Sequence, residues 1–302
     1  GKMARLLGRE SVSNEVIALF ELVKNAYDAD SPKATVTFDK VDEKNGRIIV
    51  RDYGDGMTEN DILNKWLVIG TDSKEREKFT KHGRRVVGEK GIGRFATERL
   101  AQRVTLISCP KDGSEVLELK IDWDLYEAKD ARFDNVEHEL TKRRRNESDK
   151  QGLEIILEGL RDRWTQKKID ALSEQFSGLV LPAALETNYP FTIELIAPNF
   201  RVTDTRIESN LLKKAPYRLK AILSDNQILI SAWIKDEQVI GVNLDNHRIP
   251  NTSMGCGPAI LHYYAFPRDP SVKRGEREWE KYYGPLGSQL INDMLAVHSG
   301  IR

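Results

Sequence analysis

Hydrophobic side chains near the beginning of the chain recur at the spacing of an amphipathic helix. They occupy positions i, i+3, i+4 and i+7: Val16, Leu19, Phe20 and Val23. We predict a helix over residues 13–29, with Ser13 as its N-cap and Pro32 soon after its end. Glu15 places a carboxylate in the first turn, where the helix dipole favours negative charge.

The rest of the chain alternates between short apolar runs and helical patterns, which predicts a mixed α/β architecture. In the first part, strands are expected at residues 34–38, 47–50, 104–108, 116–121 and 153–157, and helices at 59–67, 91–100 and 166–180. After a composition boundary at residues 181–188, strands are expected at 191–196, 217–223, 228–235, 238–243 and 260–266, and a final helix at 286–297. We therefore expect an α/β domain at residues 1–187 and a smaller α+β domain at residues 188–302.

Two polar stretches interrupt this regularity. Residues 70–90 are rich in Lys and Arg and have no steady period. A loop of this length inside a compact domain is usually a functional lid or disordered, and we expect a mobile lid here. Residues 141–150 are expected to form a charged connector.

Composition narrows the classes of protein to consider. Lys and Arg together number 47, as do Asp and Glu, so the zero net charge argues against a chain that mainly coats nucleic acid or an anionic membrane. No apolar run approaches the ~18 residues of a membrane-spanning helix, and no signal-peptide pattern opens the sequence. Cys109 and Cys256 cannot make a disulfide framework, so a cytoplasmic location is the default expectation. The residues ahead of Met3 and the abrupt end at Arg302 suggest a truncated chain.

The first predicted helix carries a polar face beside its apolar one. Glu21, Asn25 and Asp28 are spaced i, i+4 and i+7, so their side chains project from one side of the helix. A carboxylate and a carboxamide placed in this way can present a proton acceptor and an oxygen ligand to one pocket, and such oxygen donors suit Mg²⁺. Taken alone, this spacing is more often a solvated polar face.

Residues 52–57, with the sequence Asp-Tyr-Gly-Asp-Gly-Met, follow the second predicted strand. Gly54 and Gly56 allow the backbone to turn tightly and to approach a flat ligand. An ionised Asp52 is purely an acceptor, so it can take a hydrogen bond from an exocyclic amine such as that of adenine. By itself this pattern is also that of an ordinary Asp-Gly turn.

Residues 88–94, with the sequence Gly-Glu-Lys-Gly-Ile-Gly-Arg, lead into a predicted helix. Glycine N–H groups at a helix start can cradle phosphates, and the Lys and Arg add positive charge. The segment follows a lid-like loop rather than a strand and has no GxxxxGK[ST] pattern, which disfavours a Walker loop and a dinucleotide-binding turn.

In this order and spacing, the three motifs resemble the GHKL ATPases of the Bergerat fold. That superfamily contains DNA gyrase, the ninety-kilodalton heat-shock chaperones, histidine kinases, MutL and MORC proteins. The core of the resemblance spans residues 21–94, and it extends to about residue 165. It implies a two-layer α/β sandwich that binds ATP with Mg²⁺.

The resemblance also implies a role for each motif residue. Glu21 would be the general base that polarises the attacking water, Asn25 would hold Mg²⁺, and Asp52 would accept from the adenine amine. The wall beside adenine would be formed by Gly54, Gly56 and Met57. The phosphates would be bound by Gly88, Lys90, Gly91, Ile92, Gly93 and Arg94. Thr71 and Lys74, at the lid hinge, are candidates for a phosphate or adenine contact or for a solvated loop, and Asp28 is expected to be structural.

The branches of the superfamily differ at the position that Glu21 occupies in this chain. Histidine kinases generally have Asn where this chain has Glu21, which makes phosphotransfer the weaker alternative. The segments 8–10, 69–74 and 88–96 look most like prokaryotic MORC-like and heat-shock-chaperone-type ATPases. This implies a transducer-like second domain, lid closure, and ATP-dependent homodimerisation involving residues 3–12. Many relatives have Gly-Thr where this chain has Gly152-Leu153, so either another polar group substitutes or adenine selectivity depends more heavily on Asp52.

The purpose of ATP turnover stays open between two classes of protein. One is an ATP-gated clamp on DNA, with residues 81–85 and 142–145 as candidate basic contacts, although charge runs of this kind are more often plain solvated surface. The other is a chaperone-like or signalling module that binds protein. Salt-sensitive DNA binding and stimulation of turnover by DNA would favour the first.

Overall fold

The computed structural model describes residues 14–67, 79–84, 86–87, 93–127, 138–182, 189–202, 205–224, 227–234, 237–245 and 259–265. The chain divides into two units, Gly1–Glu208 and Ser209–Arg302. Within the described ranges, no helix is long and apolar enough to cross a membrane.

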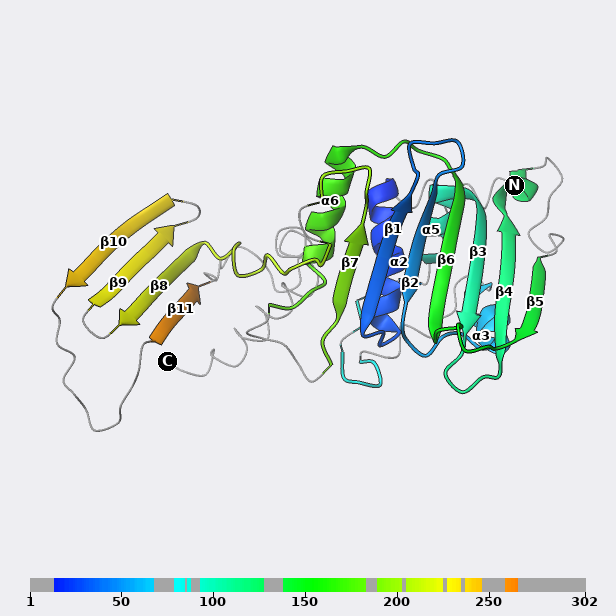
Figure 1. The fold of residues 1–302 in the computed structure, drawn as a ribbon, viewed down its shortest axis with the longest axis horizontal. Helices are drawn as coiled ribbons and strands as arrows, with labels where there is room; N and C mark the ends of the chain where they lie inside the picture. Colours follow the sequence, from blue (N-terminus) through cyan, green and yellow to red (C-terminus); the bar gives the residue numbers. More distant parts are fainter. Residues whose placement is uncertain are drawn as a thin grey trace, which may run out of the picture. The chain divides into compact units, whose positions relative to one another are not determined.

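The first unit is built on a sheet of seven strands in the order β5-β4-β3-β6-β2-β1-β7 (Figure 1). The strands are β1 (Lys33–Asp39), β2 (Arg47–Asp52), β3 (Ala101–Cys109), β4 (Glu115–Asp122), β5 (Glu139–Arg144), β6 (Gly152–Leu160) and β7 (Thr192–Ile196). Neighbouring strands are antiparallel except β1 and β7, which run parallel. The sheet therefore brings the end of β2 next to the beginning of β6, far apart in the sequence.

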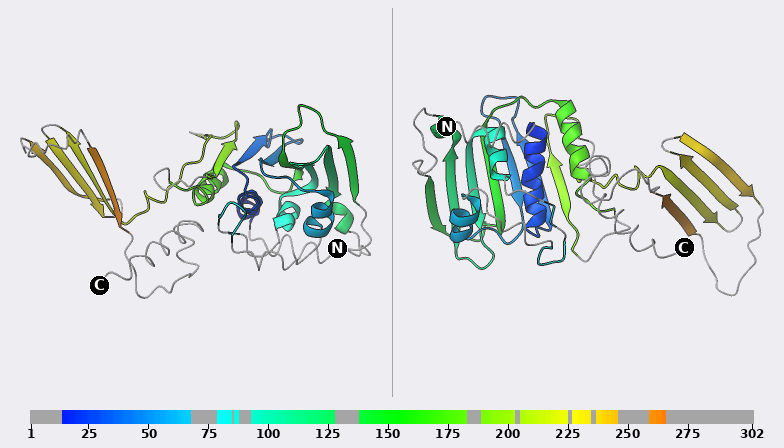
Figure 2. Two further views of the ribbon diagram at one scale, coloured as in Figure 1. Left: turned by 90° about the horizontal axis from the view of Figure 1, so that it is seen from below. Right: turned by 180° about the vertical axis from the view of Figure 1, so that it is seen from behind.

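Three helices lie over one face of this sheet: α2 (Glu15–Asp28), α5 (Gly93–Leu100) and α6 (Gln166–Ser177) (Figure 2). Shorter helical segments are α3 (Glu59–Asp61), the π-helix η2 (Ile62–Trp66) and the 3₁₀-helix η3 (Trp123–Glu127). The core between helices and sheet contains fully buried side chains from both layers, among them Leu19, Phe38, Leu106, Leu157 and Phe176. The expected two-layer α/β sandwich is confirmed.

Helix α2 forms where the apolar period predicts it, but its N-cap is Asn14. The Asn14 side chain accepts a hydrogen bond from the Ile17 N–H over 2.9 Å. Ser13, the predicted cap, lies outside the described residues. The helix ends at Asp28, and Asp30 then adopts a left-handed conformation with φ of 56° that turns the chain into β1.

The opposite face of the seven-stranded sheet is polar. Strand β1 alternates buried and half-buried positions along its whole length, as a strand covered on one side does. Ion pairs span the outer face between neighbouring strands: Lys33–Glu194 at 2.6 Å, Arg47–Asp39 at 2.8 Å and Arg51–Glu154 at 3.0 Å. Opposite charges placed across a sheet stabilise strand pairing modestly.

The prediction of a connector at residues 141–150 is wrong in its first half. Residues 139–144 form β5, which pairs with β4 so that Val116 lies opposite Arg143. Five of the six β5 side chains are exposed, because this strand is the edge of the sheet. An edge strand rich in Lys and Arg resists pairing with other chains, and its lack of an apolar face hid it from pattern analysis.

The first unit also extends further than the sequence predicted, because the units divide after Glu208 and not after residue 187. Strand β7 pairs with β1, so the segment expected to open the second domain completes the first sheet. The following residues fold back on β7, with Leu195 N–H donating to Thr205 O over 2.7 Å and Ile207 N–H to Ile193 O over 2.8 Å. These bonds keep the chain with the first unit as far as Ile207.

The second unit contains an antiparallel sheet in the order β10-β9-β8-β11. Its strands are β8 (Tyr217–Ser224), β9 (Gln227–Ile234), β10 (Glu237–Asp245) and β11 (Ala259–Ala265). All four were expected from alternation within one or two residues. The helix expected at residues 286–297 lies outside the described residues.

Candidate functional site

Helix α2 presents Glu21 and Asn25 one turn apart, both half-buried. The Lys24 ammonium lies 3.0 Å from Glu21 Oε1 and 5.7 Å from the centre of the Phe20 ring. Lys24 therefore restrains the carboxylate that the motif singles out. Sequence reasoning missed Lys24, although opposite charges spaced i, i+3 on a helix are a recognisable signal.

The loop of residues 52–56 is fastened to the end of α2. The Tyr53 N–H donates to the Ser31 hydroxyl over 2.8 Å, and that buried hydroxyl donates to Lys33 O over 2.6 Å. Gly54 lies so close to the α2 terminus that a Cβ there would be 3.1 Å from Ala29 O. These contacts place Asp52 beside the helix that carries Glu21 and Asn25.

Asp52 is the last residue of β2, and its side chain is only 8% exposed. The Gly54 N–H donates to Asp52 Oδ1 over 2.9 Å. Burial raises the pKa of Asp52 to about 6, although backbone hydrogen bonds from Gly54 and Leu153 and the charge of Arg51 oppose that rise. The structure gives this carboxylate no ion pair with any of the described residues. At neutral pH Asp52 is thus a buried and mostly ionised acceptor with unused lone pairs.

Gly56 and Met57 join the loop to the end of β3. Gly56 has φ of +69°, and a Cβ there would lie 2.7 Å from Cys109 O, so only glycine fits. The Met57 N–H donates to the Ser108 hydroxyl over 2.7 Å, and the same hydroxyl donates back to Met57 O over 2.7 Å. The fully buried Ser108 therefore fixes the residue that is expected to line the adenine wall.

At Gly152-Leu153 the structure explains the glycine, and the departure itself lies at Leu153. Gly152 has φ of +119°, and a Cβ there would lie 2.3 Å from Asp52 O. Gln151 Nε2 donates to Gly54 O over 2.9 Å, so the start of β6 supports the loop on both sides of Gly152. Gln151 is a polar group at this junction that sequence reasoning did not consider.

The segment predicted to bind phosphate is only partly within the described residues. Gly93 begins α5, which packs along α2. Thr71, Lys74, Gly88, Lys90, Gly91 and Ile92, and the side chain of Arg94, lie outside the described part. At the other end of α5, Arg99 pairs with Asp162 and, over 3.1 Å, with the buried Glu15 of α2. That pairing fixes the two helices of the site against each other.

Part of the predicted lid packs tightly against the end of α2. The Thr80 hydroxyl donates to Asp30 Oδ1 over 2.5 Å, and the Val87 N–H donates to Asp28 Oδ1 over 2.9 Å. Arg84 is only 8% exposed, which makes it unsuitable as a DNA contact. Asp28 therefore has the structural role of holding Val87, the residue that precedes Gly88.

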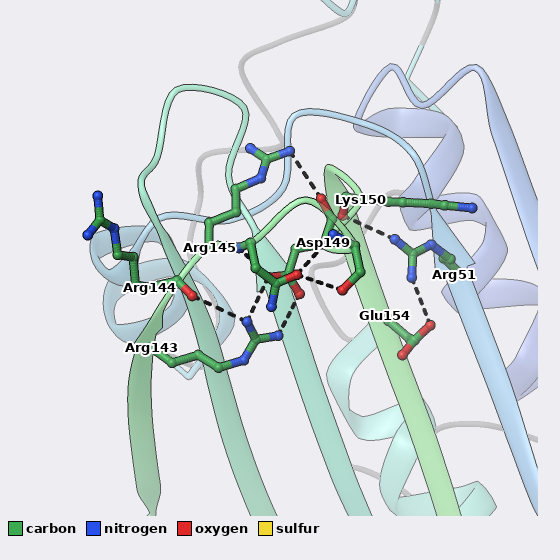
Figure 3. A network of polar contacts seen from close by, with 9 residues as sticks. Arg51, Arg143, Arg144, Arg145, Asp149, Lys150 and Glu154 are labelled. Atoms are coloured by element: carbon green, nitrogen blue, oxygen red, sulfur yellow. Dashed lines mark hydrogen bonds and ion pairs between the residues drawn. The ribbon is translucent and has the colours of Figure 1, made fainter.

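The basic segment at residues 142–145 is largely occupied by internal contacts (Figure 3). Lys142 pairs with Glu59 at 2.5 Å, and Arg143 makes two hydrogen bonds of 2.6 and 2.7 Å to Asp149, which lower the pKa of Asp149 to about 2. Arg145 donates to the carbonyl oxygens of Pro110 and Asp149. In the described part of the chain, Arg144 alone of these four side chains has no hydrogen-bond or ion-pair partner.

A cavity of about 570 Å³ adjoins Gly56, between residues 55–61 and the β3–β4 turn. Charged side chains of both signs line it, including Asp55, Glu59 and Lys111. Glu21, Asn25 and Asp52 do not line this cavity, whereas Gly56, expected in the adenine wall, does.

No group of three or more His, Cys, Asp or Glu side chains among the described residues could hold a metal ion. A magnesium ion that arrives with a nucleotide needs only one or two protein ligands, and the half-buried Asn25 carboxamide beside Glu21 suits that requirement.

Residues 12–151 match the sequence model of the histidine kinase-, DNA gyrase B- and HSP90-like ATPase family. We call this matched range the GHKL domain. Helices α2 and α5, strands β1 to β5 and the Asp52 loop lie in the matched range, whereas β6, α6 and β7 follow it. The family relationship supports ATP binding by the GHKL domain.

Curated relatives match about a third of this chain. A candidate type II restriction enzyme, HgiDII, from Herpetosiphon aurantiacus is 36% identical over 101 residues, which cover 33% of this chain and 16% of the relative. The chaperone protein HtpG of Rickettsia rickettsii is 31% identical over 128 residues, covering 36% of this chain and 21% of HtpG. HtpG of Rickettsia prowazekii is 30% identical over 136 residues, covering 38% of this chain and 22% of that HtpG. The chain spans about a fifth of the length of these relatives.

Proposed function

We propose that the GHKL domain binds Mg-ATP and hydrolyses it slowly, with Asp52 selecting adenine and Glu21 activating water. The observation that carries this proposal is the state of Asp52. It is a buried carboxylate held by two backbone donors, and it makes no ion pair with any of the described residues. An adenine amine supplies the missing donor at little cost, because the acceptor is already desolvated.

Selectivity for adenine follows from the same carboxylate. Guanine carries a carbonyl oxygen where adenine carries its amine, so it would place an acceptor against an ionised acceptor. We expect GTP to bind at least about 100-fold more weakly than ATP, since a site with an unpaired buried polar group rejects the wrong partner strongly. Equal affinities for ATP and GTP, measured by calorimetry, would remove Asp52 from this role.

The hydrolytic step is assigned to α2. Glu21 accepts a proton from water as the water attacks the γ-phosphorus, and the neighbouring Lys24 keeps the carboxylate oriented. Asn25 would hold Mg²⁺, which supplies charge neutralisation at the phosphates when it is bound. Backbone N–H groups at the start of α5 would bind the phosphates with the help of the helix dipole.

Replacing Glu21 tests this assignment. In Glu21→Ala we expect ATP to bind with unchanged affinity while steady-state phosphate release falls by roughly 10²–10⁴-fold, as is typical after loss of an acid–base group. Glu43→Ala, which removes an exposed carboxylate from the β1–β2 turn, is the matched control and should retain full turnover. Unchanged turnover in Glu21→Ala would exclude Glu21 as the base.

We further propose that ATP drives lid closure and pairing of two subunits, with residues 3–12 contributing and the second unit acting as a transducer. A nucleotide that orders a lid biases an equilibrium between open and closed states. Light scattering with a non-hydrolysable ATP analogue should report a dimer, and the same measurement with ADP should report less of it. A strictly monomeric protein with the bound analogue would contradict this proposal.

We propose that the partner is DNA and that Arg144 contacts it. Arg144 is exposed and points away from the protein, and the exposed Lys150 lies in the following turn (Figure 3). A relative described as a restriction enzyme is consistent with DNA, whereas the HtpG relatives are chaperones and favour a protein client. If DNA is the partner, it should stimulate phosphate release, and added salt should weaken that effect.

A charge reversal separates the two partner classes. Arg144→Glu should reduce the stimulation by DNA several-fold without changing basal turnover. Lys44→Glu, in the exposed β1–β2 turn, makes the same charge change far from β5 in the sheet order and should leave the stimulation intact. The absence of any DNA effect in the parent protein would favour the chaperone-like alternative.

A further inference from the structure

Arg84 is a buried arginine whose guanidinium hydrogen bonds, within the described residues, all go to carbonyl oxygens. These lie on two sides of it: Ser31 O at 2.7 Å, Tyr27 O at 3.3 Å, Tyr189 O at 3.3 Å and Pro190 O at 3.3 Å. The guanidinium also lies 5.3 Å from the centre of the Tyr27 ring and 5.6 Å from that of Phe191. The first pair of carbonyls belongs to the end of α2 and the residues just after it, and the second pair precedes β7.

The backbone around Arg84 is held by the same helix end. The Arg84 N–H donates to the Thr80 hydroxyl over 3.0 Å, and that hydroxyl donates to Asp30. The second oxygen of Asp30 accepts from the His82 N–H over 3.0 Å, and the His82 ring stacks on Tyr189 with centres 4.4 Å apart. Residues 80–84 thus form a compact turn fixed to the end of α2 and to the segment before β7.

This turn lies just ahead of the glycine segment proposed to bind phosphate. The Val87 N–H donates to Asp28 Oδ1, and the glycine segment begins at the next residue. The other end of that segment is Gly93, the first residue of α5. Both ends of the segment are therefore attached to helices that pack together, and one of these is the helix that carries Glu21 and Asn25.

We propose that Arg84 and Asp28 are positioning residues for the nucleotide phosphates. Together they fix Arg84 and Val87 against the end of α2, directly ahead of the glycine segment in the sequence. This inference rests on the proposed function, and it goes beyond it by assigning two residues that touch no substrate. It also explains why Asp28 shares a helix face with Glu21 and Asn25.

The chemistry at residue 84 requires arginine. Only a planar guanidinium has donors directed to both sides, and it loses its hydration more cheaply than an ammonium does. A lysine at this position would keep the charge but could reach one group of carbonyls only. Arg84→Lys therefore removes the bridge while retaining the cation.

Binding of ATP and of adenosine by the full chain tests the proposal, because adenosine lacks the phosphates. In Arg84→Lys and in Asp28→Ala, the dissociation constant for ATP should rise at least about tenfold, and that for adenosine should change less than about twofold. Asp28→Asn retains the acceptor oxygen for Val87 and should rescue most of the ATP affinity. Lys81→Ala removes an 83% exposed side chain from the same turn and should match the parent protein.

Three outcomes would overturn the proposal. Equal weakening of ATP and adenosine would mean that the two residues only maintain the fold. Unchanged ATP affinity in both variants would mean that the glycine segment is positioned without them. Failure of Asp28→Asn to restore affinity would show that the hydrogen bond from Val87 is not the relevant contact. Failure of the parent protein to bind ATP would instead refute the proposed function, so the two failures are distinguishable.

Discussion

The two sheets of the molecule follow the same alternation of side chains, but their apolar faces have different surroundings. In the first sheet, Phe38, Leu106 and Leu157 point toward the helical layer and are fully buried. Its opposite face carries charged residues that pair across strands. Helices α2 and α5 bury the apolar face of this sheet, and they also carry residues of the candidate site.

In the second sheet, the pairing register places apolar residues on one face and mostly polar residues on the other. The apolar face includes Leu219, Ala221, Ile230, Ala232, Ile240, Val242, Leu261 and Tyr263. Leu261 and Tyr263 are 61% and 60% exposed, and the described residues of this unit include no helix. Alternation of apolar and polar side chains is therefore enough to form a sheet. A buried core and a candidate site also require a layer of helices that covers the apolar face.

The largest expected difference concerns core packing. Phe38 is fully buried, with ring centres 4.9 Å from Trp164 and 6.2 Å from Phe200. Phe38→Ala should lower the free energy of unfolding by about 3–5 kcal/mol, measured by denaturant titration. Leu261→Ala in the second sheet should cost less than about 0.5 kcal/mol. A cost for Leu261→Ala close to that of Phe38→Ala would show that the exposed face is covered in solution.

The next difference concerns glycines in the two sheets. Gly152→Ala forces a side chain into a left-handed conformation and against Asp52 O, and it should cost about 3 kcal/mol of unfolding free energy while weakening ATP binding. Gly241→Ala meets only the flexible end of Gln238, at 2.8 Å, and should change stability by less than about 0.5 kcal/mol. Thermal unfolding of both variants decides the comparison, and similar costs would contradict it.

A third prediction concerns the pH dependence of stability. Folding raises the pKa of Asp52 from its ordinary 3.8 to about 6, so the folded state favours the protonated carboxyl. The stability that Asp52 contributes is therefore present below pH 3.8 and is lost as the pH rises through 6. Asp52→Asn should be more stable than the parent above pH 6, by up to about 3 kcal/mol, and this advantage should vanish toward about pH 4.

The control for this measurement lies in the second sheet. Glu237→Gln neutralises an exposed carboxylate of β10 and should show no comparable pH-dependent difference in unfolding free energy. A pH-independent difference for Asp52→Asn would mean that Asp52 is not an unpaired buried acid. ATP binding by Asp52→Asn should be lost in either case if the proposed function holds.

The smallest expected effect concerns charges on the outer surfaces. Arg51→Ala removes the ion pair with Glu154 on the outer face of the first sheet and should cost no more than about 1 kcal/mol. Arg218→Ala, on the polar face of the second sheet, should have an effect of the same size. Denaturant titration at low and high salt checks both, and a larger loss in only one of them would show that its polar face supports a packed layer.

Much of the candidate site could be predicted from the sequence because its signals are local. Glu21, Asn25 and Asp28 fall on one helix face by spacing alone, and the glycines of residues 54 and 56 mark the turn after β2. Their roles toward nucleotide stay predictions, and several of the predicted phosphate contacts lie outside the described residues. The contribution of Lys24 was also local, although it went unnoticed.

Other parts of the site depend on contacts between distant segments. Gly152 is required because β6 starts against Asp52, and Ser108 holds Met57 from the end of β3. Arg84 lies in a run of cations, and nothing in that run distinguishes the buried arginine from its exposed neighbours. Strand β5 was missed for the opposite reason, since an edge strand exposed on both faces has no apolar period.

The sequence by itself therefore determined most of the elements and the order of the motifs, because helix and strand periods and tight turns depend on a few consecutive residues. The tertiary structure decided which charges are buried, which glycines have no substitute, and where the first unit ends. The physical reason is that burial and close approach arise between segments far apart in the chain, and no local pattern records them.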